Sequence, residues 1–164
     1  MAPQSRLEAA YREHHATVFR AAYRITGNAA DAEDVLQTVF LRLARHPEPG
    51  AGVENLKAYL HRSAVNASLD ILRSRGAEKL EALEDPDALV SQRSESDGDL
   101  RDWLAKALAT LNPRHAEMFT LRYVEEMDNR DIAAIMNTSK AVVAITLFRV
   151  RKQLQKAFSQ GAIR

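Results

Sequence analysis

Apolar residues recur at helical spacing in two blocks of this chain, and an acidic stretch without that spacing separates the blocks. A period near 3.6 residues is typical of amphipathic helices, and no segment shows the alternation that is typical of strands. The pattern predicts helices over residues 7–25, 31–45, 56–75, 100–111, 113–124, 128–136 and 140–158. We therefore expect an all-α fold of two small helical domains, residues 1–77 and 102–164, joined by a flexible acidic linker over residues 78–101.

Residues with known preferences at helix ends mark several of these boundaries. Gly76 is expected to end the third helix, and Asn55 can cap its start. In the second block Asn112 precedes Pro113, and proline suits the first turn of a helix. Asp128 can cap the helix that follows.

The 23 basic and 22 acidic side chains nearly cancel over the whole chain, but their distribution is uneven. Residues 1–77 carry a net charge of +2, residues 78–102 carry −6, and residues 103–164 carry +5. Such asymmetry indicates a polyanionic partner for the basic blocks and a separate role for the middle. A solvated linker remains the alternative for the acidic segment.

Several classes of function find no support in the residues. The chain has no cysteine and no glycine-rich nucleotide-binding motif. Its histidines lack metal-binding spacing, so we expect no metal, cofactor or enzymatic activity, and we expect these five residues on the surface: His14, His15, His46, His61 and His115. No apolar run reaches the roughly 18 residues of a membrane span, and the N-terminus lacks a signal-peptide core. We therefore expect no membrane insertion and a cytoplasmic location.

The C-terminal block has the spacing of a helix-turn-helix unit. A short helix ends near Met136, residues 137–139 form a turn, and a longer helix begins at Lys140. The second helix of such a unit enters the major groove of duplex DNA. The C-terminal half of this helix carries cations that suit phosphate contacts: Arg149, Arg151, Lys152 and Lys156. A three-helix bundle with a solvated basic face remains the alternative.

The third predicted helix offers a different set of groups. Amides, cations and one aromatic residue lie along its polar faces: Asn55, Lys57, Tyr59, His61, Arg62, Asn66 and Arg73. Together with the proline-containing loop before it, this helix can bind single-stranded nucleic acid by stacking and backbone contacts. A core position for Tyr59 is the simpler interpretation of that residue.

Residues 31–43, DAEDVLQTVFLRL, resemble the polymerase-binding helix of extracytoplasmic-function sigma factors, the small members of the sigma-70 family. The neighbouring segments YRITG, NLKAYL and NASLDILR are similar to that family too. In the second block, LNPRHAEMF and LRYVE resemble the start of the family's fourth domain, and DIAAIM resembles its first helix-turn-helix helix. The resemblance covers residues 7–75 and 102–158.

The resemblance implies a function in transcription initiation. Proteins of this family bind core RNA polymerase, and their second domain captures the −10 non-template strand while their fourth domain contacts the −35 duplex. It also implies an anti-sigma factor as a partner, and a linker that threads polymerase channels built for nucleic acid.

The resemblance also implies roles for individual residues. Contacts with the β′ clamp helices of polymerase are expected at Asp34, Gln37, Thr38 and Arg42. The resemblance also implies a contact with the β flap of polymerase. Contacts with the −10 strand are expected at Asn55, Lys57, Tyr59, Arg62, Asn66 and Arg73, with an extruded base held by the loop 46–54. Contacts with the −35 duplex are expected at Lys140, Val142, Thr146, Arg149, Arg151 and Lys152.

The recognition helix departs from the family pattern. Ala144, Ile145 and Thr146 stand where Lys-Ser-Arg or a similar run is common, so arginine or lysine readout of guanine is missing there. Val142, Ile145 and the methyl group of Thr146 could contact thymine methyl groups instead. Weak −35 binding and a protein contact remain alternatives.

Two functions of other classes also remain open. A helix-turn-helix regulator would bind duplex DNA without polymerase. A sigma-like interaction module would clasp a regulatory protein, such as an anti-sigma factor, with reduced −35 binding. Joint purification with core polymerase separates these alternatives from a sigma factor.

Overall fold

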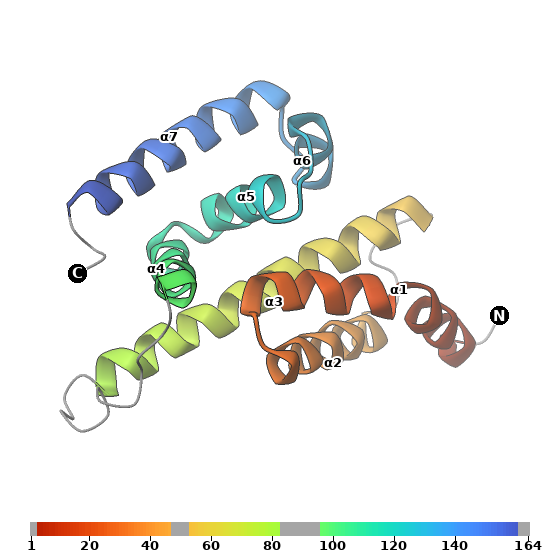
Figure 1. Ribbon diagram of the computed structural model, residues 1–164. Coiled ribbons are helices and arrows are strands. Elements are labelled where there is room, and N and C mark those ends of the chain that lie inside the picture. Colours follow the sequence, from red (N-terminus) through yellow and green to blue (C-terminus); the bar gives the residue numbers. More distant parts are fainter. Residues whose placement is uncertain (1–2, 47–52, 83–95, 161–164) are drawn as a thin grey trace.

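The computed structural model describes residues 3–46, 53–82 and 96–160 (Figure 1). Seven helices follow one another in these ranges: α1 (Pro3–Thr26), α2 (Ala29–Arg45), α3 (Val53–Ala82), α4 (Ser96–Thr110), α5 (Pro113–Tyr123), α6 (Asn129–Ile135) and α7 (Lys140–Ser159). No strand occurs in the described ranges, and the predicted all-α class is confirmed.

Side-chain caps begin four of the helices. In each case an oxygen of the capping side chain accepts a backbone N–H of the first turn, and the caps of α2, α5, α6 and α7 are Asn28, Asn112, Asp128 and Ser139. The predicted caps Asn112 and Asp128 are confirmed, with donor–acceptor distances of 2.9 and 2.8 Å. Each such cap stabilises its helix by about 1 kcal/mol.

α3 is longer at both ends than the sequence predicts. It begins at Val53, so Asn55 lies inside the first turn and does not cap it, and it continues through Gly76 to Ala82. The prediction that Gly76 ends the helix is wrong because good helix formers follow it, and they outweigh the roughly 1 kcal/mol that one glycine costs.

The predicted linker is correspondingly shorter than expected. Residues 78–82 belong to α3, and α4 begins at Ser96 rather than at residue 100. Both ends of the segment 78–101 are therefore helical. Its middle, residues 83–95, lies outside the described residues.

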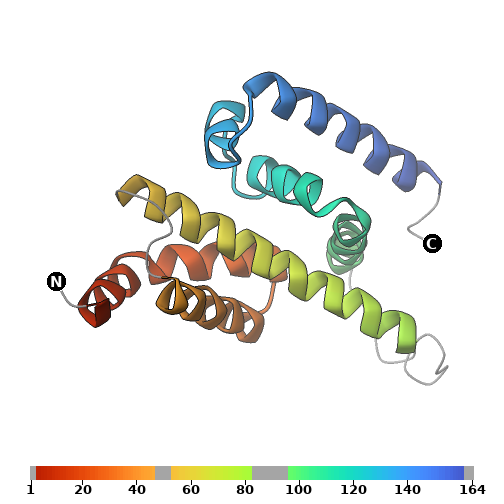
Figure 2. The same ribbon diagram turned by 180° about the vertical axis from the view of Figure 1, so that it is seen from behind.

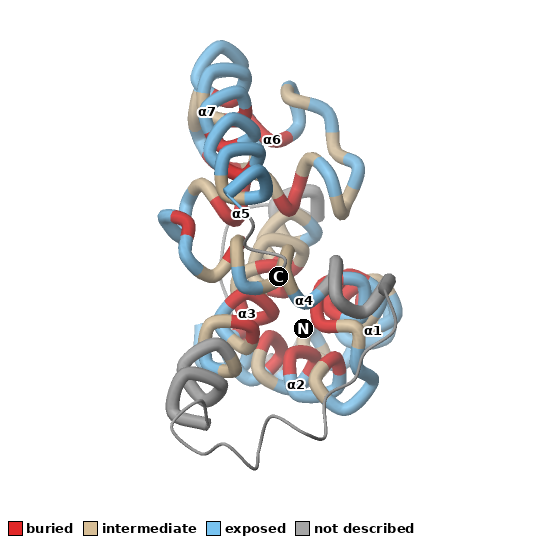
Figure 3. Tube along the Cα trace, turned by 60° about the vertical axis from the view of Figure 1, so that its left-hand side comes forward, coloured by how far each residue is buried: buried red, intermediate tan, exposed pale blue. Residues whose placement is uncertain are grey.

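The first bundle consists of α1, α2 and the first half of α3, which pack against one another (Figures 1 and 3). Their apolar stripes meet in a buried core that includes Val18, Ala22, Val35, Val39, Phe40, Leu43 and Leu60. Because α2 directs its apolar face into this core, its opposite face is left to solvent.

The second bundle is formed by α4, α5, α6 and α7, and its core extends across into the first. Residues buried within it include Leu108, Leu111, Met118, Leu121, Ile132, Val143 and Leu147. The same core takes in Ile25 of α1 and Val65, Leu69 and Leu72 of α3. α3 therefore lies between the two bundles, with α1 and α2 on one side and α4 and α5 on the other (Figure 2).

Among the described residues, no single helix is both long and apolar enough to cross a membrane. α6 and α7 meet such a test only when they are counted together, and they are bent by 107° relative to each other.

The shared core predicts a large effect of Leu69→Ala, because this side chain is 1% exposed on α3 between the two bundles. We expect the free energy of unfolding in urea to fall by about 2–5 kcal/mol. The exposed Ser74 of the same helix supplies the control, and Ser74→Ala should change stability by less than about 0.5 kcal/mol. A loss below about 1 kcal/mol for Leu69→Ala would show that the two bundles do not share a core.

Candidate polymerase and nucleic-acid interfaces

The outer face of α2 carries the residues expected to bind polymerase. Asp34, Gln37 and Arg42 are exposed, and Thr38 is half-buried. Helical spacing places Leu41 on the same face, and it is 58% exposed although it is apolar. Leu41 was not predicted as a site residue, because in the sequence it is one of several leucines in an apolar helix.

An open apolar cleft adjoins this face between α1 and α2. It has a volume of about 790 Å³, and Gln37, Phe40 and Leu41 of α2 line one side of it. On the α1 side, the ring of Tyr11 meets Phe40 edge to face with a centroid distance of 5.0 Å. The expected polymerase face therefore combines polar groups with exposed apolar surface.

α3 gathers most of the residues expected to bind the −10 strand. By helical spacing Tyr59, Arg62, Asn66 and Arg73 share one face, whereas the exposed Lys57 lies on another. Tyr59 packs against the first core, as the simpler interpretation of this residue predicts. The side chain of Asn55 lies outside the description, and so do residues 47–52 of the loop expected to hold a base.

Arg62 is paired with a carboxylate of the second bundle. Its guanidinium donates hydrogen bonds to both oxygens of Glu117 on α5, with Nη2 and Oε2 3.5 Å apart. Glu117 is only 3% exposed, so its charge is buried and needs this partner. Arg62, which is predicted to bind the −10 strand, is thus already paired with a carboxylate of the same chain.

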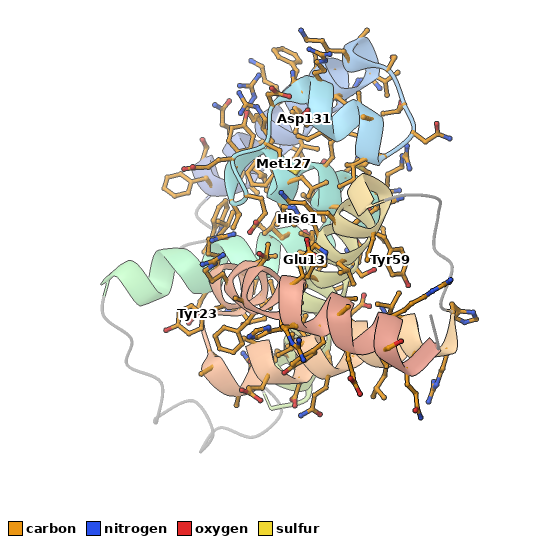
Figure 4. All side chains as sticks on the ribbon, turned by 90° about the vertical axis from the view of Figure 1, so that its right-hand side faces the viewer. Glu13, Tyr23, Tyr59, His61, Met127 and Asp131 are labelled. Atoms are coloured by element: carbon orange, nitrogen blue, oxygen red, sulfur yellow. The ribbon has the colours of Figure 1, made fainter. Side chains whose placement is uncertain are left out.

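A second carboxylate, Glu125, follows the end of α5 and joins the bundles in the same way. Arg24 of α1 donates to both of its oxygens, at 3.0 and 2.7 Å, and Nε2 of His61 lies 2.8 Å from Oε2. Burial alone would raise the pKa of Glu125, but the hydrogen bonds from His61 and Arg24 outweigh it and lower the pKa from 4.5 to about 2. In Figure 4 His61 lies on α3 where the two bundles meet.

The expectation that the histidines lie on the surface is wrong for His14, and His61 is only partly exposed. His14 is 7% exposed because it lies four residues from both Ala10 and Val18, on the buried stripe of α1. The side chain of His61 is 19% exposed because it contacts Glu125. In the described part of the chain, no cluster of three or more His, Cys, Asp or Glu side chains could hold a metal ion.

α6 and α7 form the expected helix-turn-helix geometry. Their axes are bent by 107°, and Asn137 in the turn adopts a φ of 53°, which asparagine tolerates well. α7 buries Val143, Leu147 and Val150. Of the residues expected to contact −35 DNA, Thr146 is half-buried and five are exposed: Lys140, Val142, Arg149, Arg151 and Lys152.

The lowered pKa of Glu125 predicts a pH-dependent contribution to stability. Because the folded-state pKa lies below 4.5, ionised Glu125 stabilises the fold above that pH, and this contribution is lost as the pH falls from 4.5 towards 2. Near neutral pH, Glu125→Gln should therefore lower the free energy of unfolding by about 1–3 kcal/mol. The difference from the unmodified chain should shrink below pH 4.5, as measured by urea unfolding.

Glu126 is the matched control, since it is the same residue type one position further along and is exposed. Glu126→Gln should leave stability near its original value at each pH. An equal loss from both variants, or a loss from Glu125→Gln that does not depend on pH, would contradict the assignment.

Two family models match this chain, one over each bundle. The sigma-70 region 2 family model matches residues 10–78, and the sigma-70 region 4 model matches residues 101–154. The ECF RNA polymerase sigma factor SigE of Mycolicibacterium smegmatis is 33% identical over 153 residues, which cover 88% of this chain and 58% of that protein. This chain therefore spans less than two thirds of the length of that relative.

One further relative and one solved structure are also similar to this chain. The RNA polymerase sigma-E factor of Streptomyces avermitilis is 30% identical over 145 residues, covering 88% of this chain and 80% of that protein. The fold is similar to that of the sigma factor RpoE from Bartonella quintana, solved in complex with the anti-sigma factor NepR, with a TM-score of 0.53, 23% identity, and coverage of 93% and 96% of the two chains. This chain belongs to the extracytoplasmic-function sigma factors of the sigma-70 family.

Proposed function

We propose that the chain binds core RNA polymerase and directs it to a set of promoters. The observation that carries this proposal is the outer face of α2, where Asp34, Gln37 and Leu41 remain exposed on a helix whose other face is fully buried. A helix with one buried and one exposed face can dock on another helical surface. Family membership indicates the β′ clamp helices of polymerase as that surface. In this role the chain is an initiation factor, the polymerase supplies the catalysis, and the site of action is the cytoplasm.

The two bundles of the chain have different roles in this function. Residues 1–77 act at the −10 element through the face of α3, and residues 102–164 act at the −35 duplex and the β flap. Residues 78–101 connect them, and the negative charge of this segment suits a polymerase channel that otherwise holds nucleic acid. An anti-sigma factor is a proposed regulator, because the Bartonella relative of similar fold was solved with one.

The test of this function is run-off transcription with core polymerase on a library of genomic fragments. Transcripts that begin at fixed sites only when the chain is present support it. A chain that binds duplex DNA alone and never joins polymerase is instead a helix-turn-helix regulator. A chain that binds neither is an interaction module.

The α2 face predicts the effect of the double substitution Asp34→Ala and Gln37→Ala. Removing both side chains from an interface should weaken core binding by about tenfold or more, because each contact contributes about 1 kcal/mol. Both residues are exposed, so the melting temperature should not change. Binding is measured by fluorescence anisotropy with labelled chain and core enzyme.

A matched control removes the same two residue types elsewhere, at the exposed Gln4 and Asp102. The control pair should bind core enzyme as well as the unmodified chain does. Unchanged binding of the α2 double variant would remove this face from the polymerase interface.

The pairing of Arg62 with Glu117 predicts competition between the second bundle and the −10 strand. Glu117→Gln replaces a charged hydrogen-bond partner with a neutral one, which weakens the hold on Arg62 by about 1 kcal/mol. The free chain should then bind a single-stranded −10 oligonucleotide about fivefold more tightly. Anisotropy titration of the free chain measures this change.

Two controls accompany this measurement. Glu126→Gln should leave the affinity for the oligonucleotide unchanged. Arg62→Ala should lower this affinity both in the unmodified chain and in the Glu117→Gln variant. Equal affinity of Glu117→Gln and the unmodified chain would show that Arg62 does not contact the strand.

A further inference from the structure

The exposed face of α7 is divided along its length into an apolar part and a basic part. In the N-terminal half Val142, Ile145 and Phe148 are 46%, 53% and 55% exposed. In the C-terminal half Arg149, Arg151, Lys152 and Lys156 are exposed. The helix has five basic residues and no acidic one.

The exposed apolar residues are not needed for the core of the second bundle. Val143, Leu147, Val150 and Leu154 already fill the inner face of α7. Ile145 lies two residues from both Val143 and Leu147, which turns its side chain to the opposite side of the helix. The apolar part of the face is therefore available to a partner.

The charges around the apolar residues favour nucleic acid as that partner. By helical spacing Arg149 and Lys152 lie in line with Ile145 and continue its exposed face toward the C-terminus. Lys140 and Arg151 lie to one side of that face. An apolar face that cations continue along the helix suits a major groove, in which base edges lie beside phosphates. A protein partner of apolar character would have to bury these cations.

We propose that α7 reads thymine methyl groups in the −35 duplex, with Ile145 as the central contact and Val142 and the methyl group of Thr146 beside it. This inference rests on the proposed function. The N-terminal residues of a recognition helix face base edges, and thymine alone among the four bases presents a methyl group there. In the stretch from Ala141 to Phe148 no side chain can donate two hydrogen bonds to guanine. A·T pairs are thus expected at the positions that face Val142, Ile145 and Thr146.

The test exchanges thymine for deoxyuridine, which removes the methyl group and keeps base pairing. The preferred duplex is first selected from a randomised pool with the full chain, alone and bound to core polymerase. Single exchanges are then compared by competition binding, and one or two positions should lose about fourfold in affinity for each methyl group removed.

Two variants identify the side chain that makes the contact. Ile145→Ala should bind the thymine duplex more weakly and should lose most of its preference for thymine over deoxyuridine. Arg149→Gln should weaken binding to both duplexes equally and should flatten the salt dependence, as expected for a phosphate contact. Circular dichroism checks that both variants fold.

The outcomes separate this inference from the proposed function. If initiation at fixed sites persists but no exchange to deoxyuridine changes affinity, methyl readout is overturned and the sigma-factor function stands. If the chain never joins polymerase, the proposed function fails, while duplex binding by the chain alone still decides the question of methyl readout. If Ile145→Ala binds the selected duplex as the unmodified chain does, the apolar row serves a protein contact and the inference is overturned.

Discussion

Two carboxylates with buried side chains pair across the contact between the two bundles of this sigma factor. Glu117 and Glu125 both belong to the second bundle, yet their cationic partners Arg62, Arg24 and His61 come from the first. A buried charge without a partner costs several kcal/mol, so separating the bundles requires water to replace these contacts. The apolar residues of α3 that complete the second core also hold the two bundles together.

The helices themselves could be predicted because the signals that form them are local. Apolar periodicity placed α1, α2, α5, α6 and α7 within a few residues of their observed bounds, and the caps Asn112 and Asp128 were recognised from side-chain chemistry. The length of α3 was missed because Gly76 was weighed without the helix formers that follow it. The polar face of α2 and the helix-turn-helix were likewise predictable, since each lies within one continuous segment.

The contacts between the bundles could not be predicted in the same way. Arg24 and Glu125 are 101 positions apart and Arg62 and Glu117 are 55 apart, and no periodic pattern relates such pairs. A partial signal existed at Glu117, which stands between the buried Ala116 and Met118. A carboxylate beside apolar core positions needs a cationic or hydrogen-bonding partner, but only the fold identifies Arg62 as that partner.

The two candidate DNA surfaces are consequently in different states in the compact chain. On α3, Arg62 already pairs with a carboxylate, so the proposed contact of Arg62 with the strand requires it to leave Glu117. On α7, no carboxylate of the described residues pairs with the cations, and the apolar row is exposed. The proposed duplex contact through α7 therefore leaves the pairs between the bundles intact, whereas the proposed strand contact at Arg62 breaks one of them.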